Sequence, residues 1–219
     1  MTHPEPVRLP VLYEDEDIRA IGKPSGLSVL MDNTGAPSLA DRYLDEFKEP
    51  PLFVHRLDKG TSGALLLARR EEARKFLSRS FAKGVVKKTY LALVSGIPKV
   101  RSGRIEFPLE KARKGKFRVA RNGSGLPAIT EFRVVKEAEE QSLLEIYPLT
   151  GRTHQIRAHL QALGHPLVQD PLYGLKRAKP SLHPTLTLHA WRIEFPHPIR
   201  EERISIEAEA PLWASRLLG

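Results

Sequence analysis

The spacing of apolar residues predicts a chain of short strands interrupted by helices. Alternating or continuous apolar runs bounded by turn residues indicate strands. On this criterion we expect strands at Val11–Tyr13, Ile18–Lys23, Phe53–Leu57, Ala64–Arg69, Lys88–Ser95, Arg104–Pro108, Ile129–Lys136, Ser142–Pro148, Thr185–Phe195 and Arg203–Glu209. Apolar residues at helical spacing predict helices at Ser38–Phe47, Glu71–Lys83, Thr153–Leu163 and Leu212–Leu218. Strands broken by helices favour a mainly antiparallel α+β fold over a regular βαβ alternation.

The ends of the helices carry recognisable residues. Ser38 is a good N-cap for the first helix, and Gly84 stands where a glycine closes the second. Thr153 is the expected N-cap of the third helix. Gly164 follows that helix at the expected position, with Pro166 two residues beyond. These residues define the predicted boundaries.

One segment places a carboxylate between two apolar runs. In His55-Arg-Leu-Asp-Lys-Gly-Thr-Ser-Gly-Ala64, Asp58 stands beside a His, an Arg and a Lys and precedes a turn of small residues. A lone acid at a strand end, facing such a turn, is typical of a catalytic group on a rigid scaffold. An Asp that closes the turn by accepting backbone N–H bonds is the other interpretation. This segment alone leaves both open.

A second segment crowds cations onto the third predicted helix. Ile156, Leu160 and Leu163 recur at the spacing of one buried helical face. The same segment carries several basic and polar side chains with no acid among them, namely Arg152, His154, Gln155, Arg157 and His159. A solvated helix face explains this crowding poorly. The cluster indicates an anionic ligand or an unpaired carboxylate elsewhere in the chain.

Together the two segments resemble the two signature motifs of the RluA-type pseudouridine synthases. Further parts of the chain resemble that family in the expected order, from about Val11 to Pro211: Val11–Leu27 with its Lys-Pro-x-Gly turn, the Tyr-bearing Lys87–Gly96, Asp170–Gly174 and Leu188–Trp191. The departures are Gln169, where relatives usually carry Gly, and Glu110–Pro127, which matches nothing in the family.

The resemblance implies a fold and an activity. The fold is a long bent sheet with flanking helices around a central cleft, which we expect residues 1–219 to form as a single catalytic domain. The resemblance begins by Val11, so we expect a short form without an N-terminal RNA-binding module. The absence of an unexplained apolar segment favours a monomer. The activity is the isomerisation of specific uridines in RNA.

Composition and charge agree with an RNA partner. The formal net charge is +9, from 35 Lys and Arg against 26 Asp and Glu. The stretch Lys111–Arg121 holds six cations and no acid, and a polyanion backbone is its natural partner. Simple solubility is the alternative explanation. We therefore expect Arg113, Lys114 and Lys116 to contact RNA.

The chain has no cysteine and no run of 18 apolar residues. This excludes disulfides, thiolate nucleophiles and Cys-ligated zinc, and it predicts no membrane partner. The start of the chain lacks the basic and apolar stretches of a signal peptide. We expect a cytoplasmic protein.

The family reaction assigns roles to individual residues. The N1–C1′ bond must break, the uracil must turn, and C5 must bond to C1′, which requires neither a metal nor a cofactor. By match to the family, Asp58 is the essential carboxylate, Arg157 its guanidinium partner, and Tyr90 the active-site Tyr that stacks on uracil and lies near the C5 proton. Whether Asp58 attacks C1′ or C6 or removes the 2′ proton stays open.

The remaining candidate residues serve RNA binding. Arg152 is the second choice for the guanidinium, or a phosphate ligand, and we place His154 with it on the substrate side. His55 and Arg56 are expected to serve the RNA, with Arg56 filling the stack that a flipped base leaves. The expected substrate is a stem-loop of rRNA, of tRNA or of both.

Two other classes of function fit less well. A non-catalytic RNA-binding protein explains the charge but not Asp58 within the most cationic motif, where an acid weakens phosphate binding. A metal-dependent hydrolase needs clustered carboxylates or paired histidines. His154 and His159 are five residues apart, which does not place both on one helical face.

Overall fold

The computed structural model describes residues 8–121, 123–175 and 186–218 and confirms the α+β prediction. The helices are α1 Leu39–Phe47, α2 Glu71–Ala82, α3 Gln155–Ala162 and α4 Leu212–Leu218, and a 3-10 turn occupies Arg113–Gly115. The strands are β1 Val11–Glu14, β2 Ile18–Lys23, β3 Leu52–Phe53, β4 Ser62–Ala68, β5 Lys87–Ser95, β6 Ser102–Ile105, β7 Leu109–Lys111, β8 Phe117–Val119, β9 Thr130–Ala138, β10 Gln141–Pro148, β11 Leu188–Pro196 and β12 Arg203–Glu207.

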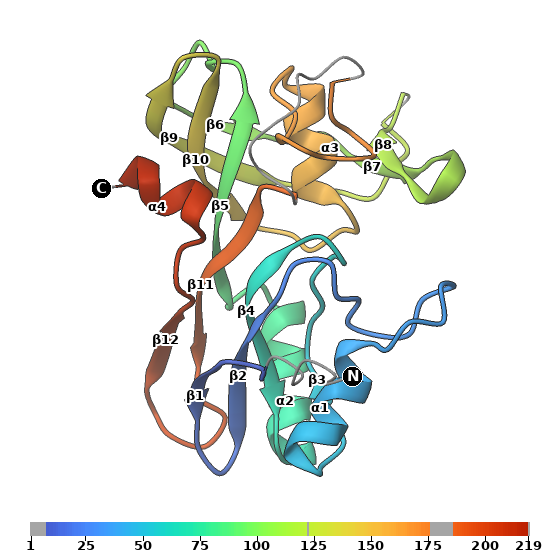
Figure 1. Cartoon of the computed structure of the whole chain (residues 1–219), viewed down its shortest axis with the longest axis vertical. Helices are drawn as coiled ribbons and strands as arrows, with labels where there is room; N and C mark the ends of the chain where they lie inside the picture. The colour runs from blue at the N-terminus through green and yellow to red at the C-terminus, as the bar shows by residue number, and fades with distance from the viewer. Residues whose placement is uncertain (1–7, 122, 176–185, 219) are drawn as a thin grey trace, which may run out of the picture.

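Ten of the described strands form one sheet that bends through the whole molecule (Figure 1). Its order is β1-β2-β4-β11-β5-β10-β9-β6, with β12 paired to β11 and β3 paired to β4. Among the described strands the pairing of β4 with β11 is parallel and the others are antiparallel. In Figure 1 the lower half contains β1, β2, β4, α1 and α2, and the upper half contains β6, β9, β10 and α3. The long strands β5 and β11 connect the two halves.

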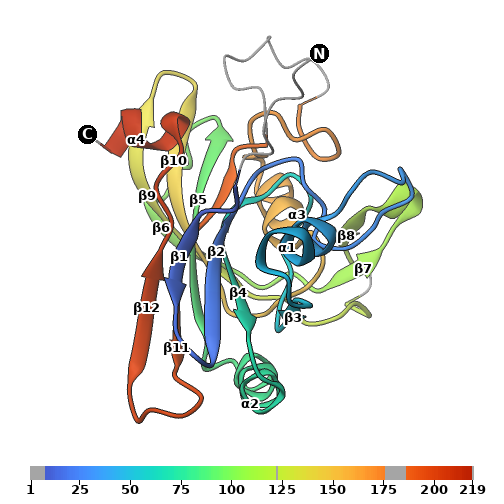
Figure 2. The ribbon, with the colours of Figure 1, turned by 60° about the horizontal axis from the view of Figure 1, so that its bottom comes forward.

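In the lower half, helices cover both faces of β4 (Figure 2). Leu65 and Leu67 pack with Tyr43 of α1 on one face. Leu66 points the other way and packs with Leu77 of α2. Successive side chains of a strand face opposite sides, so a strand covered on both sides needs an unbroken apolar run. This explains the continuous apolar sequence that precedes Arg69.

In the upper half the sheet is covered on both faces in the same way. Ile156 and Leu160 of α3 join the apolar cluster that contains Val94 of β5 and Ile146 of β10. Trp213 of α4 packs on the opposite face of the sheet. The predicted buried face of the third helix is thereby confirmed. Its anchoring fixes the direction of the polar side chains at the start of α3.

No helix among residues 8–121, 123–175 and 186–218 is long and apolar enough to cross a lipid bilayer.

Three of the predicted helix ends are confirmed. Ser38 caps α1 and forms a capping box with Asp41, because each side chain accepts the backbone N–H of the other residue. Gly84 follows α2 with φ +70, and Gly164 follows α3 with φ +89. Glycine adopts these left-handed conformations without the steric cost that other residues incur.

The predicted start of α3 is wrong by one residue. His154, not Thr153, occupies the N-cap position, and it does so with φ 55 and without a side-chain hydrogen bond to the helix. The side chain of Gln155 holds the preceding turn instead, since its Oε1 accepts the N–H of Arg152 at 3.0 Å. A non-glycine residue in the left-handed region stores backbone strain, which is frequent at functional sites.

The strand predicted at Phe53–Leu57 is also wrong beyond its first residue. β3 ends at Phe53, and the chain bends at Val54 and His55. The Nε2 atom of His55 accepts the N–H of Leu66 in β4 at 2.9 Å, so an imidazole replaces a strand partner there. The segment that carries Asp58 is therefore a loop.

Smaller differences concern strand limits. β6 is Ser102–Ile105 rather than Arg104–Pro108, and β11 begins at Leu188. Thr185, where we predict the start of that strand, lies outside the described residues. The hairpin formed by β7 and β8 is not predicted by the apolar pattern, because both strands are short and rich in charged residues.

Gly63 occupies a position in β4 that no side chain fits. Its φ is +111, and a Cβ there would lie 2.2 Å from the carbonyl oxygen of Ala190 in the parallel pairing with β11. We expect Gly63→Ala to lower the free energy of unfolding by about 3 kcal/mol, because strain at positive φ and overpacking each cost about 1–3 kcal/mol. Urea unfolding measures this change. Gly84→Ala is the matched control, with φ +70 and open space, so equal losses would contradict the packing argument.

Candidate active site

A cleft of about 730 Å³ lies where the two halves of the sheet meet. The loop between β3 and β4 lines it from the lower half, and the start of α3 with its preceding turn lines it from the upper half. Asp58, Tyr90 and Arg157 all contribute to the lining. The two signature segments, far apart in the sequence, therefore face the same space.

Asp58 presents its carboxylate to this cleft. The turn after it is closed by the main chain, since the N–H of Thr61 donates to the carbonyl oxygen of Asp58 at 3.0 Å. Among the described residues, no backbone N–H donates to the Asp58 carboxylate. Its Oδ2 lies 3.3 Å from Nη1 of Arg157 and 3.9 Å from Nε2 of His154. The side chain, one quarter exposed, is thus free to meet a substrate.

Arg157 is held by a second carboxylate. Its Nε and Nη2 donate to Oδ2 and Oδ1 of Asp170, each at 2.8 Å, which leaves Nη1 directed at Asp58. Burial alone would lower the pKa of Arg157, but the hydrogen bonds and charge of Asp170, together with the charge of Asp58, raise it. Burial likewise opposes ionisation of Asp170, whose pKa is nonetheless lowered by Arg157 and by the N–H groups of Leu172 and Tyr173. The guanidinium is therefore a fixed, permanent positive charge beside Asp58.

Tyr90 lies on β5 and is half-buried in the cleft wall. It packs against the apolar clusters of both halves of the sheet. Burial and the negative charge of Asp58 both raise the pKa of Tyr90. Its hydroxyl is therefore protonated at neutral pH and acts first as a hydrogen-bond donor.

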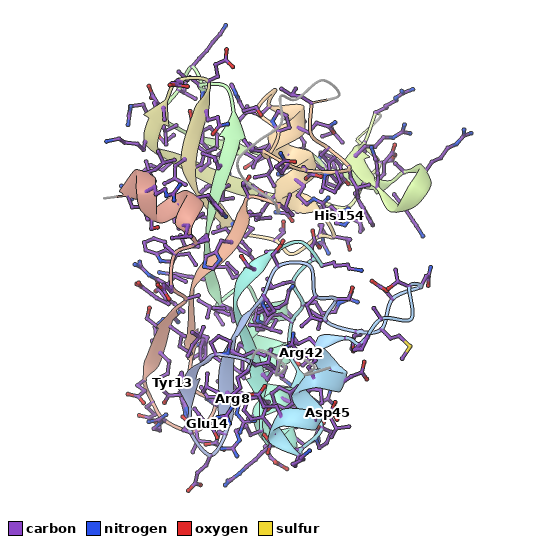
Figure 3. All side chains as sticks on the ribbon, viewed as in Figure 1. Arg8, Tyr13, Glu14, Arg42, Asp45 and His154 are labelled. Atoms are coloured by element: carbon purple, nitrogen blue, oxygen red, sulfur yellow. The ribbon has the colours of Figure 1, made fainter. Side chains whose placement is uncertain are left out.

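His154 links the cleft to Tyr173. Figure 3 places His154 in the upper half, at the side that faces the lower half. Its Nδ1 lies 3.1 Å from the hydroxyl of Tyr173, and the two rings meet edge to face. Burial lowers the pKa of His154 despite the opposing charge of Asp58. The ring of Tyr173 also lies 5.0 Å from the Arg157 guanidinium.

Three predicted RNA-binding residues line the cleft around Asp58 and Arg157. His55 is half-buried, and its ring stacks on Phe81. Arg56 is exposed beside Asp58. Arg152 is exposed as well, with its Nε donating to the carbonyl of Pro127. Arg152 therefore stands at the rim, whereas Arg157 takes the place beside the carboxylate.

The basic hairpin does not line the cleft and packs next to it. Arg113 is exposed in the turn between β7 and β8, and the side chain of Lys114 lies outside the described residues. Lys116 donates to the carbonyl of Leu172 and lies 5.7 Å from the ring of Tyr173. The N–H of Phe117 also donates to the Tyr173 hydroxyl, at 2.7 Å. The hairpin is thus anchored on the segment that follows Asp170.

Sequence reasoning missed two residues that organise the site. Asp170 belongs to Asp-Pro-Leu-Tyr-Gly174, which the family resemblance includes but to which it gives no role. Lys23 is only 1% exposed, and its ammonium donates to the carbonyls of Pro24, Leu27 and Lys59. Burial lowers the pKa of Lys23 to about 8, with Asp58 opposing the shift. The Lys-Pro-x-Gly turn was the available signal for a lysine that ties two loops together.

The described residues also bring Asp15, Asp17 and His197 within reach of one ion. This cluster lies beside Tyr13, near the end of the lower half that is far from His154 (Figure 3). The carboxylate of Asp15 already accepts hydrogen bonds from Tyr13, His197 and Arg200. A metal there would have to displace the Arg200 guanidinium, so the donor set fits an internal ion pair better.

Comparison with known proteins finds relatives that match most of this chain. Residues 18–162 match the family model described as RNA pseudouridylate synthase. The chain is 40% identical to an uncharacterized RNA pseudouridine synthase of Zymomonas mobilis, over 92% of this chain and 93% of the relative. It is 32% identical to ribosomal large subunit pseudouridine synthase D of the same organism, over 95% and 71%. The solved structure of human RNA pseudouridylate synthase domain containing 1 is similar with a TM-score of 0.82 and 26% identity, covering 100% of this chain and 89% of that one.

Proposed function

Because the chain belongs to the RNA pseudouridylate synthase family and is an RNA pseudouridine synthase, we propose that Asp58 is the essential group of its reaction. The observation that carries the proposal is the contact between Asp58 and Arg157 across the cleft, at 3.3 Å. A fixed guanidinium favours the ionised carboxylate. Only an ionised carboxylate can attack C1′ or C6, or remove the 2′ proton.

In this proposal Tyr90 positions the uracil. Its ring stands in the wall of the cleft, where a flipped base can stack on it. The raised pKa keeps its proton in place, so the hydroxyl can donate a hydrogen bond to the uracil. To accept the C5 proton, Tyr90 would first have to release its own. We therefore assign it the orientation of the base during the turn from N1 to C5.

We propose a stem-loop of large-subunit ribosomal RNA as the substrate. The support is the similarity to a relative named ribosomal large subunit pseudouridine synthase D. A paired or stacked uridine must leave its stack before Asp58 can reach it, at a cost of a few kcal/mol. Arg56 is exposed beside Asp58 and is placed to occupy the vacated position. His154 and Arg152 flank the opposite side of the cleft, where they can bind neighbouring nucleotides.

The basic hairpin supplies a testable part of the RNA interface. We expect Arg113→Glu to weaken binding of the RNA substrate and to reduce the slope of log affinity against log salt by about 1, because one phosphate contact is lost. Arg113 is the appropriate site, since Lys116 anchors the hairpin on Leu172. Filter binding at several salt concentrations measures the slope. Lys99→Glu, an exposed change in the turn between β5 and β6, is the control; equal effects of the two changes would discard the hairpin as a contact.

Pseudouridine mapping tests the function in cells. Ribosomal and transfer RNA from cells lacking this protein would be compared with RNA from cells complemented by wild type or by Asp58→Ala. We expect a defined site in large-subunit ribosomal RNA to be lost, and to return only with wild type. Restoration by both would mean that Asp58 is dispensable. Loss of a site in transfer RNA alone would keep the activity and overturn the proposed substrate.

A further inference from the structure

One part of the cleft lining contains an ammonium group with no acidic partner among the described residues; we call this part, formed by Lys88, His55, Val54, Phe81 and Val86, the arm of the cleft. Lys88 lies two residues before Tyr90 on β5, so both side chains leave the same face of the strand and line the cleft. Lys88 is half-buried. Among the residues that the structure describes, its ammonium forms no ion pair or hydrogen bond. Burial lowers the pKa of Lys88, and no carboxylate opposes that shift. A cation in such surroundings is stabilised by an anionic partner.

His55 adds a second donor to the same arm. Its Nε2 accepts the N–H of Leu66, and a backbone N–H can only donate. Burial and the charge of Lys88 lower the pKa of His55 to about 3, so the ring is neutral at physiological pH. The single ring proton must then reside on Nδ1, for which no partner exists among the described residues. Lys88 and His55 both line the cleft, and His55 stacks on Phe81 of the same cleft wall.

The walls of this arm favour a compact anion. Val54, Phe81 and Val86 belong to one apolar cluster and form an apolar wall beside it. In such surroundings a charge contact is stronger than on an open surface. A neutral carbonyl would satisfy the His55 donor but would leave the Lys88 charge uncompensated. A phosphate offers several acceptor oxygens and the negative charge together.

We propose that Lys88 and His55 form a subsite for the phosphate group attached to the target uridine. The inference rests on the proposed function, because it places the uracil of that nucleotide on Tyr90. Residues two apart on a strand are separated by about 7 Å. A base on Tyr90 and a phosphate on Lys88 can therefore belong to one nucleotide. The subsite holds the ribose between them, beside Asp58, for attack or proton removal.

Binding of mononucleotides tests the subsite without requiring turnover. Affinities of the purified protein for uridine, uridine 5′-monophosphate and uridine 3′-monophosphate would be measured by NMR titration at low salt. We expect wild type to bind at least one monophosphate about tenfold more tightly than uridine, as a charge-assisted hydrogen bond would give. Lys88→Gln should lose this preference while binding uridine as before, and Lys88→Arg should keep part of it.

Lys87→Gln is the matched control, because Lys87 is the adjacent exposed residue of β5 and points to the opposite face. It removes the same charge and should leave the preference intact. Equal losses in Lys87→Gln and Lys88→Gln, or equal affinities of wild type for uridine and both monophosphates, would overturn the subsite. Failure of the proposed function appears separately in the mapping experiment. A phosphate preference that needs Lys88 would stand even if no RNA site were lost.

Discussion

Replacing Asp58 with Asn is expected to reduce the rate of pseudouridine formation by at least about 10⁴-fold, the scale of removing a nucleophile or general base. An amide has nearly the shape of the carboxylate but can neither attack carbon nor take a proton under these conditions. The contact with Arg157, 3.3 Å away, loses its opposite charge at the same time. Single-turnover assays on the mapped RNA, read by nucleoside chromatography, measure the rate.

The control for this variant is Asp32→Asn. Asp32 is also an aspartate near the loop that carries Asp58, but it pairs with Lys59 at the surface. We expect Asp32→Asn to keep a rate within a few-fold of wild type. RNA binding by Asp58→Asn should be unchanged or tighter, since a negative charge beside the phosphates is removed. A rate for Asp58→Asn within tenfold of wild type would contradict the role proposed for Asp58.

The sequence predicts the fold correctly where residues close together in the chain determine the local structure. The continuous apolar run in β4 requires cover on both faces, and α1 and α2 provide it. Ser38 and Gly164 define helix ends because their backbone preferences are local. The prediction errors occur where a side chain distant in the sequence takes part in the local hydrogen bonding. β3 ends at Phe53, and the N–H of Leu66 is taken by the His55 imidazole instead of a strand partner, which no local pattern encodes.

The candidate site likewise combines residues that the sequence identifies with contacts that only the folded chain shows. Asp58, Tyr90 and Arg157 follow from the motifs and the family resemblance, although Asp58 and Arg157 are 99 residues apart. The resemblance does not reveal that Asp170 accepts hydrogen bonds from two of the three guanidinium nitrogens of Arg157, Nε and Nη2. That arrangement depends on two bonds formed only in the folded chain. The left-handed backbone of His154 is equally invisible in sequence, because the surrounding structure imposes it.

Replacing Asp170 with Asn is expected to lower kcat by about 10- to 100-fold with little change in KM. The side chain of Asp170 is fully buried and cannot reach RNA, so it acts as a positioning residue through Arg157. In the variant the Asn oxygen can replace Oδ1, which accepts the N–H groups of Leu172 and Tyr173. The amide NH₂ then faces the Nε–H of Arg157, donor against donor. Arg157 shifts away from Asp58, and misplacement by about 1 Å can cost about 10²-fold.

Stability alone could lower activity, so this prediction needs a matched control. Glu49→Gln removes one carboxylate partner of Arg19, another buried arginine that lies away from the cleft. Loss of one partner of a buried ion pair costs about 3–5 kcal/mol, so Asp170→Asn should unfold earlier in urea. Glu49→Gln should lose less stability, because Glu49 is one-third exposed and Arg19 keeps Glu14 as a partner. We expect only Asp170→Asn to lower kcat, with partial recovery in Asp170→Glu, which restores the charge. If Glu49→Gln lowers kcat equally, or if Asp170→Asn raises KM instead, Asp170 does not act by aiming Arg157 at Asp58.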